Sequence, residues 1–114
     1  MLCVNMCSIP VRGWPKMQVL DEGLVEEELA RLKDWRRDAR FIVRRYDFPS
    51  FADAVRFVND VAAAAERRRH HPFIAIDYKH VTLRMTSWRA GGLTALDFEQ
   101  AAAFDQIYRA AQTV

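Results

Sequence analysis

The sequence predicts an α+β domain, a small antiparallel β-sheet with helices packed on one face, in the order helix, strand, helix, strand, strand, helix. Apolar residues change from helical spacing to alternation and back along the chain. The last two predicted strands are joined by a tight turn, which fits antiparallel pairing. A chain of 114 residues, 51% hydrophobic and 28% charged, suffices for one globular core but not for two.

Residues 1–16 show no regular spacing of apolar residues, unlike the rest of the chain, and Pro10, Gly13 and Pro15 interrupt them. We expect a flexible N-terminal extension at 1–16, with an interaction arm as the alternative, and one domain at 17–114. Both cysteines, Cys3 and Cys7, fall in the extension. Two sulfurs do not complete a structural zinc site, so we expect no metal and a reducing, cytoplasmic location.

The first helix is predicted over residues 23–35 and the first strand over 40–48. Three leucines, Leu24, Leu29 and Leu32, form an apolar stripe, and glutamates 26–28 place negative charge near the helix start. The strand is rich in β-branched and aromatic residues, and Pro49 ends it.

The second helix is predicted from Ser50, a good N-cap, to Arg69. Its apolar residues recur at helical spacing, and arginines 67–69 lie in the last turn, where they complement the helix dipole. Pro72 follows closely and stops the helix. This places His70 and His71 at a helix-to-strand junction.

Two strands, at 73–78 and 81–88, are predicted to form a hairpin around Lys79. Residues 81–88 alternate between an apolar and a mostly polar face. The hairpin returns Trp88 to the level of His70 and His71, whereas His80 stays near the turn, roughly 26 Å from Trp88 at 3.3 Å per residue.

The last helix begins with a capping-box pattern formed by Thr94 and Asp97, after the connection Gly91-Gly92. The small sheet that these elements form has an edge that a second subunit can extend. We therefore expect a homo-oligomer.

Two of the three histidines, His70 and His71, are adjacent. Because the unperturbed pKa of histidine lies near neutrality, such a pair is suited to acid/base catalysis. The alternative is a pair of helix-end rings that interact with the terminal carbonyl groups.

The spacing around these histidines resembles that of the pterin-4a-carbinolamine dehydratases. The pattern is Glu66, then His70-His71-Pro72, Tyr78, Trp88 and Asp97. The segments around residues 46–51, 81–83 and 91–98 agree with it, so that the resemblance covers roughly residues 20–111.

The resemblance implies an enzyme that dehydrates 4a-hydroxytetrahydrobiopterin to quinonoid dihydropterin in tetrahydrobiopterin recycling, without metal or organic cofactor. It implies that His70 protonates the leaving hydroxyl, that His71 binds the pterin and assists proton transfer, and that Asp97 orients the site. The substrate-binding residues that it implies are Glu66, Arg69, Pro72, Thr86, Ser87, Trp88 and Arg89.

The chain departs from the family pattern at Trp88, where the usual residue is a third catalytic histidine. An indole donates a hydrogen bond but does not shuttle protons near neutral pH. Losing one general acid/base costs on the order of a hundredfold in rate. Trp88 can instead stack on a flat pterin.

The expected partners are a pterin substrate, further copies of the chain in a homodimer or homotetramer, and an aromatic amino acid hydroxylase as pathway partner. No apolar run approaches the roughly 18 to 20 residues of a membrane span. The net charge of +2 does not indicate a polyanion partner, so nucleic-acid binding ranks last. The alternative function is a dehydratase-like binding or assembly module, of the kind that assembles ribulose bisphosphate carboxylase.

Overall fold

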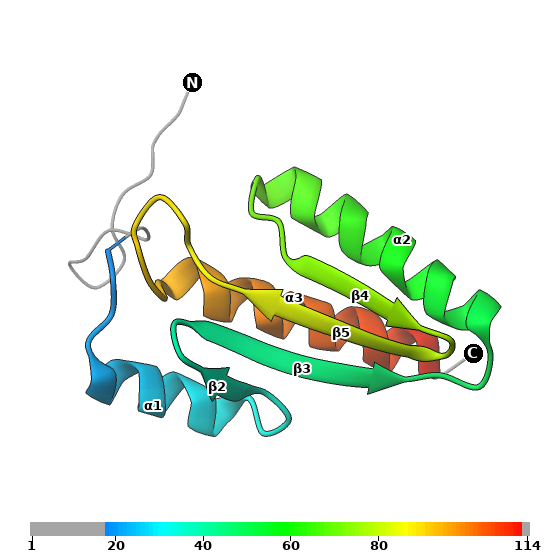
Figure 1. The fold of residues 1–114 in the computed structure, drawn as a ribbon, viewed down its shortest axis with the longest axis horizontal. Coiled ribbons are helices and arrows are strands. Elements are labelled where there is room, and N and C mark those ends of the chain that lie inside the picture. The colour runs from blue at the N-terminus through cyan, green and yellow to red at the C-terminus, as the bar shows by residue number, and fades with distance from the viewer. Residues whose placement is uncertain (1–17, 113–114) are drawn as a thin grey trace.

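The computed structural model describes residues 18–112. The elements in this part of the chain, shown in Figure 1, are α1 (Glu22–Arg31), β2 (Arg36–Asp38), β3 (Phe41–Asp47), α2 (Phe51–Arg68), β4 (Phe73–Asp77), β5 (His80–Met85) and α3 (Ala95–Gln112). The extension predicted at 1–16, with Cys3 and Cys7, lies outside the described residues.

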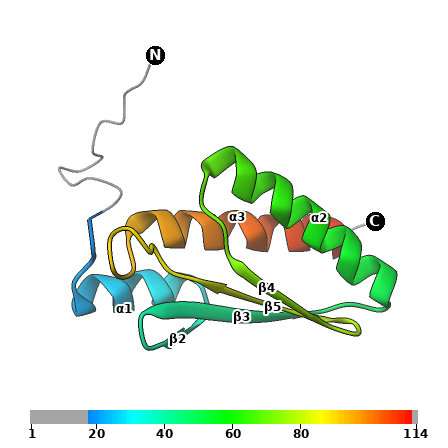
Figure 2. The ribbon, with the colours of Figure 1, turned by 45° about the horizontal axis from the view of Figure 1, so that its top comes forward.

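The four strands form one antiparallel sheet in the order β2-β3-β5-β4. Figure 2 shows the helices of residues 18–112 gathered on one face of this sheet, and none of them covers the other face. The predicted α+β class is therefore confirmed. Among residues 18–112, no helix combines the length and apolar character that a membrane span requires.

The strand β2 is a feature that the sequence pattern does not predict. Its three residues are all exposed, so they carry no alternation of apolar and polar side chains. The strand forms because Ala39, in the left-handed region with φ 56°, turns the chain so that Asp38 pairs with Phe41. A short exposed strand held by a tight turn has no apolar signal in the sequence.

The first helix ends four residues before the predicted end at residue 35, because α1 spans Glu22–Arg31. Trp35 is not helical but buried in the core, where its indole Nε1 donates hydrogen bonds to the carboxylate of Asp105. The prediction is wrong at this end because Trp35 fits the helical spacing of the leucines in sequence. In the structure it packs into the core from outside the helix.

The second helix agrees closely with the prediction. The Ser50 hydroxyl accepts a hydrogen bond from the backbone N–H of Asp53, as an N-cap does. At the other end Arg69 adopts the left-handed conformation with φ 54°, and this ends α2.

The hairpin of β4 and β5 packs one face against the helices. In β5, Val81, Leu83 and Met85 are at most 1% exposed, while the residues between them are partly exposed. The predicted alternation is therefore confirmed. The strand ends at Met85, three residues before the predicted end at Trp88, and residues 86–94 form a loop closed by a bridge between Ser87 and Gly92.

Candidate active site

The end of helix α2 positions His70. The left-handed turn at Arg69 lets the backbone N–H of His70 donate to the carbonyl oxygen of Ala65, at 3.1 Å. His70 is then buried, with only 8% of the residue exposed. This junction therefore directs one histidine of the pair into the protein.

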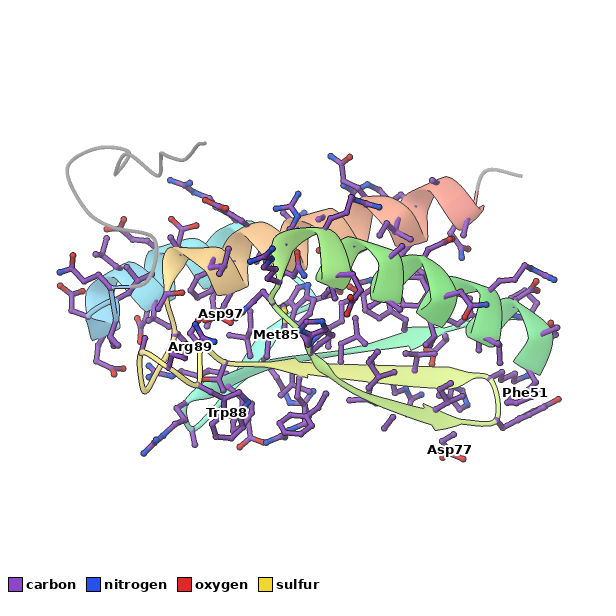
Figure 3. All side chains as sticks on the ribbon, turned by 90° about the horizontal axis from the view of Figure 1, so that it is seen from above. Phe51, Asp77, Met85, Trp88, Arg89 and Asp97 are labelled. Atoms are coloured by element: carbon purple, nitrogen blue, oxygen red, sulfur yellow. The ribbon has the colours of Figure 1, made fainter. Side chains whose placement is uncertain are left out.

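The start of helix α3 supplies Asp97, which is completely buried. Its Oδ2 accepts hydrogen bonds from the backbone N–H of Thr94 at 2.9 Å and from the hydroxyl of Ser87 at 2.8 Å. Its Oδ1 lies 2.6 Å from Nε2 of His70. One carboxylate thus joins the end of α2, the loop after β5 and the first turn of α3, as Figure 3 shows for Asp97 between helix and sheet.

The Asp97 contact orients the imidazole of His70. An ionised carboxylate only accepts hydrogen bonds, so Nε2 of His70 carries the hydrogen toward Asp97. The other ring nitrogen, Nδ1, is left to give or take a proton elsewhere. A carboxylate-held imidazole of this kind can act as a general acid or base.

His71 forms a second histidine–carboxylate pair. Its Nε2 lies 2.6 Å from Oε2 of Glu66, which is on the last turns of α2. The side chains of His71 and Glu66 are 58% and 76% exposed. The two adjacent histidines therefore have similar partners in opposite surroundings, one buried and one open to solvent.

The loop after β5 contributes two buried hydroxyl groups. Ser87 is 1% exposed and binds both Asp97 and the hydroxyl of Thr94. Thr86 is 3% exposed, and its hydroxyl has no hydrogen-bond partner within residues 18–112. Ser87 therefore belongs to the His70 site by contact, while Thr86 brings an unpaired polar group to the same loop.

Trp88 lies apart from the hydrogen-bonded group. It is 62% exposed and packs edge-on against Phe41 and Phe73, with ring centroids 5.6 and 5.9 Å away. Figure 3 shows Trp88 on the helix-free side of the sheet, whereas Asp97 lies on the helix side. Because Phe73 follows His71 by two residues, Trp88 is still at the histidine end of the hairpin.

The remaining predicted site residues make no hydrogen bond or ion pair through their side chains in the described part of the chain. Arg69 is exposed at the end of α2, and Arg89 is exposed in the loop after β5. Pro72 is partly buried between His71 and β4. His80 lies at the far end of β5, where its Nδ1 is 2.6 Å from Oδ1 of Asp47.

Gln100 is a residue of this region that sequence reasoning missed. It is completely buried, one turn after Asp97, and its Nε2 donates to the backbone carbonyl oxygen of His70 at 2.8 Å. The available signal was an amide on the buried face of an amphipathic helix, a position where polar groups are costly. Over residues 18–112, no cluster of three or more His, Cys, Asp or Glu side chains is arranged to hold a metal ion.

Comparison with known proteins identifies the family of the chain. The family model described as "Pterin 4 alpha carbinolamine dehydratase" matches residues 18–107, which include all the site residues named above. The chain belongs to the pterin-4a-carbinolamine dehydratase family. The resemblance that the spacing of His70, His71, Trp88 and Asp97 indicates is therefore confirmed.

Relatives within the pterin-4a-carbinolamine dehydratase family match the chain over most of their length. A protein of Chloroflexus aurantiacus, named a candidate pterin-4-alpha-carbinolamine dehydratase, is 44% identical over 91 residues, 80% of this chain and 98% of its own. A protein of Picosynechococcus with the same name is 40% identical over 88 residues, 77% of this chain and 96% of its own.

Solved structures confirm the fold of the pterin-4a-carbinolamine dehydratase family. The crystal structure of a transcriptional coactivator/pterin dehydratase from Brucella melitensis superposes with a TM-score of 0.77 at 28% identity, covering 80% of this chain and 99% of that one. A pterin dehydratase-like protein identified as a RuBisCO assembly factor in the α-carboxysome has a TM-score of 0.57 at 23% identity, covering 66% and 89%. This second likeness concerns the fold alone.

Proposed function

We propose that the protein dehydrates 4a-hydroxytetrahydrobiopterin to quinonoid dihydropterin, by histidine acid/base catalysis. The observation that carries this proposal is the buried contact between Nε2 of His70 and Oδ1 of Asp97, at 2.6 Å. It leaves Nδ1 of an oriented imidazole for the substrate, inside a family whose name gives the reaction class.

The reaction requires one proton donor and one acceptor. In the proposed step His70 begins as the imidazolium, with Nε2–H on Asp97. Its Nδ1–H protonates the C4a hydroxyl, the C4a–O bond breaks, and water leaves. The N5 lone pair forms the C4a=N5 double bond, and His71 takes the N5 proton, with Glu66 stabilising the imidazolium at 2.6 Å. Protons balance, because one enters with the leaving water and one departs from N5.

The same proposal assigns the substrate contacts. The hydroxyl of Thr86, buried and unpaired within residues 18–112, is available to a polar atom of the pterin. The exposed ring of Trp88 offers a stacking surface, and Arg69, Pro72, Ser87 and Arg89 complete the surroundings. The chemistry needs no metal or organic cofactor, and an aromatic amino acid hydroxylase is the class of enzyme that supplies the substrate, in the cytoplasm.

The test compares two histidines that have similar carboxylate partners. Replacing His70 with alanine should lower the dehydration rate on the order of a hundredfold or more, because the positioned acid is lost. The control is His80→Ala, which removes a histidine that also lies 2.6 Å from a carboxylate but at the far end of β5. A rate in His70→Ala equal to that in His80→Ala would contradict the proposal.

A second candidate function is a binding or assembly module without dehydratase activity. It is favoured by Trp88, which places an indole where the family usually has a histidine and forms an exposed cluster with Phe41 and Phe73. A protein that shows no turnover above the spontaneous rate, but binds one partner at fixed stoichiometry independently of His70, would support this candidate.

We also propose that the protein is a homodimer joined through strand β4. Among residues 18–112 this strand pairs only with β5, and all five of its residues are exposed. Phe73, Ile74 and Ile76 are 53%, 37% and 39% exposed, a concentration of apolar side chains that an isolated edge strand seldom carries. A second copy of β4 would cover these side chains and satisfy the open backbone groups.

A further inference from the structure

The buried amide of Gln100 is the feature that neither the fold nor the proposed reaction explains. It lies on α3 between the apolar residues Phe98, Ala101 and Phe104, all of them buried. Its Nε2 donates one hydrogen bond, and its Oε1 has no partner within residues 18–112. An apolar side chain of the same size would fill the site without the cost of a half-satisfied amide. The single bond that Gln100 makes therefore has to account for its presence.

That bond ends on the backbone carbonyl oxygen of His70, at 2.8 Å. His70 is then held at three polar atoms: its N–H donates to Ala65, its carbonyl oxygen accepts from Gln100, and its Nε2 contacts Asp97. The first contact belongs to the end of α2 and would form at any helix end of this type. The other two come from α3, one helical turn apart.

Two contacts from one rigid helix constrain both the backbone and the ring of His70. With the carbonyl oxygen fixed, the Cα–Cβ bond points toward Asp97, and with Nε2 fixed, the ring cannot rotate freely about Cβ–Cγ. The ring nitrogen Nδ1 remains the one polar atom of His70 without a partner in residues 18–112. For the neighbouring His71, the one side-chain hydrogen bond within residues 18–112 is that between its ring and the exposed Glu66.

We propose that Gln100 is a positioning residue that fixes the imidazole of His70 through the His70 carbonyl oxygen, keeping Nε2 on Asp97 and Nδ1 free for proton exchange. The part of this inference that concerns the reaction rests on the proposed dehydratase function. The part that concerns the orientation of the ring does not, because it can be measured without substrate.

The test replaces Gln100 with methionine, which preserves the length of the side chain and removes the donor. The matched control is Gln106→Met, at an exposed glutamine on the same helix. Nitrogen-15 NMR of the free protein at a pH where His70 is neutral reports the ring tautomer. We expect one protonated and one unprotonated nitrogen in the unmodified protein and in Gln106→Met, and shifts averaged between the two states in Gln100→Met.

Steady-state kinetics on the same three proteins supply the second readout. A side chain that acts only by orienting the acid should lower kcat about tenfold to a hundredfold and leave KM within about twofold. The variant Gln100→Asn, whose shorter amide does not reach the carbonyl oxygen, should reproduce both effects. It serves as the test protein if Gln100→Met does not fold.

The outcomes separate the two proposals. Averaged ring shifts with a lowered kcat support the positioning role. Averaged shifts in a protein that has no dehydratase activity support the orientation of His70 by Gln100 and contradict the proposed function. Ring shifts unchanged in both Gln100 variants overturn the positioning role. Averaged shifts with kcat unaltered support the orientation of His70 by Gln100 and overturn its contribution to the reaction.

Discussion

His70 and His80 make the same kind of contact in different surroundings. Each has a ring nitrogen 2.6 Å from a carboxylate oxygen, of Asp97 and Asp47 respectively. The side chains of His70 and Asp97 are 9% and 0% exposed, whereas those of His80 and Asp47 are 33% and 58% exposed. A hydrogen bond of this type is electrostatically stronger away from water, so the buried pair holds one ring orientation more firmly. Burial, and not the contact itself, distinguishes the candidate catalytic histidine.

The variant Asp97→Asn tests the orienting role of the buried carboxylate. The two carboxylate oxygens of Asp97 accept hydrogen bonds from three donors, on His70, Ser87 and Thr94. An asparagine has one oxygen and an NH₂ group, which cannot accept a hydrogen bond, so it no longer accepts from all three. We expect kcat to fall on the order of a hundredfold. Rates are to be measured beside Asp47→Asn, which alters the exposed pair and should leave kcat within about twofold. Equal rates for the two variants would count against an orienting role for Asp97.

A second variant is Trp88→His. If the missing third histidine limits the rate, a third proton-transfer group at this end of the hairpin, beside His70 and His71, should raise kcat several-fold, up to the order of a hundredfold. The control is Trp88→Phe, which keeps an aromatic ring against Phe41 and Phe73 without an ionisable group. A kcat that is the same in both variants would show that the position does not limit catalysis in this chain.

At the level of the elements, sheet and helices are joined by a second buried polar contact, about two helical turns beyond Asp97 on α3. The carboxylate of Asp105, on α3, accepts hydrogen bonds from Tyr46 on β3 at 2.6 Å, from Arg44 at 2.7 Å and from Trp35 at 3.0 Å. Burial, together with the bond to Asp105, raises the pKa of the Tyr46 hydroxyl well above its usual value near 10. Tyr46 therefore stays protonated in the folded protein under conditions that ionise it in the unfolded chain.

This difference predicts a loss of stability at high pH. Because the unfolded tyrosine releases its proton near pH 10 and the folded one retains it, Tyr46 favours the folded state fully below about pH 10 and progressively less above it. The decline attributable to this one group is about 1.4 kcal/mol per pH unit. Urea unfolding measured between pH 8 and 11 should show this component in the unmodified protein and not in Tyr46→Phe.

The same substitution should also lower the unfolding free energy at pH 8 by about 1–3 kcal/mol, since a buried hydrogen bond to a charged group is removed. The control is Tyr78→Phe, at a tyrosine that is 64% exposed, for which we expect no change in either quantity. If Tyr46→Phe and Tyr78→Phe have the same alkaline profile as the unmodified protein, the buried hydroxyl of Tyr46 is not the source of the decline.

The elements that the sequence predicts well are those whose signal is local. Helix α2 has a capping serine, an apolar period and a proline beyond its end, and strand β5 of the hairpin alternates between apolar and polar residues after a tight turn. Strand β2 and the core position of Trp35 depend on contacts with distant parts of the chain and leave no periodic signal. The family resemblance indicates Asp97 as a partner of the histidines. Neither the resemblance nor the spacing of apolar residues indicates that Trp88 lies on the helix-free side of the sheet. The same is true of the hydrogen bond from Gln100 to His70.

At the scale of the whole molecule, the exposed edge of the sheet sets the expected assembly. In a two-residue hairpin the pair Asp77–His80 closes the turn, so the backbone groups of residues 73, 75 and 77 face β5 and those of Ile74 and Ile76 face outward. A twofold axis through Ala75 would place Ile74 of one subunit opposite Ile76 of the other. This register uses every outward backbone group of β4 and pairs apolar side chains with each other.

The corresponding prediction is that Ile76→Lys dissociates the dimer. A lysine at this position brings two like charges toward the twofold axis and removes two of the apolar contacts. Light scattering after size-exclusion chromatography should give at least twice the 13.2 kDa of one chain for the unmodified protein and a single-chain mass for the variant. The control is Val19→Lys, at an exposed apolar residue outside the sheet, which should leave the mass unchanged. An unmodified protein that runs as a monomer would exclude the β4 interface.

The carboxylate of Asp97 serves a helix and an imidazole at the same time. Its Oδ2 caps the first turn of α3 through the N–H of Thr94, while its Oδ1 contacts His70. A descendant of this chain that no longer needed the reaction would therefore still need the aspartate to begin α3. Among sequences of unknown activity, an aspartate at this position is consequently a poor marker of retained catalysis. The imidazole of His70 caps no helix. The presence or absence of a histidine at position 70 therefore indicates more reliably than Asp97 whether a descendant kept the reaction.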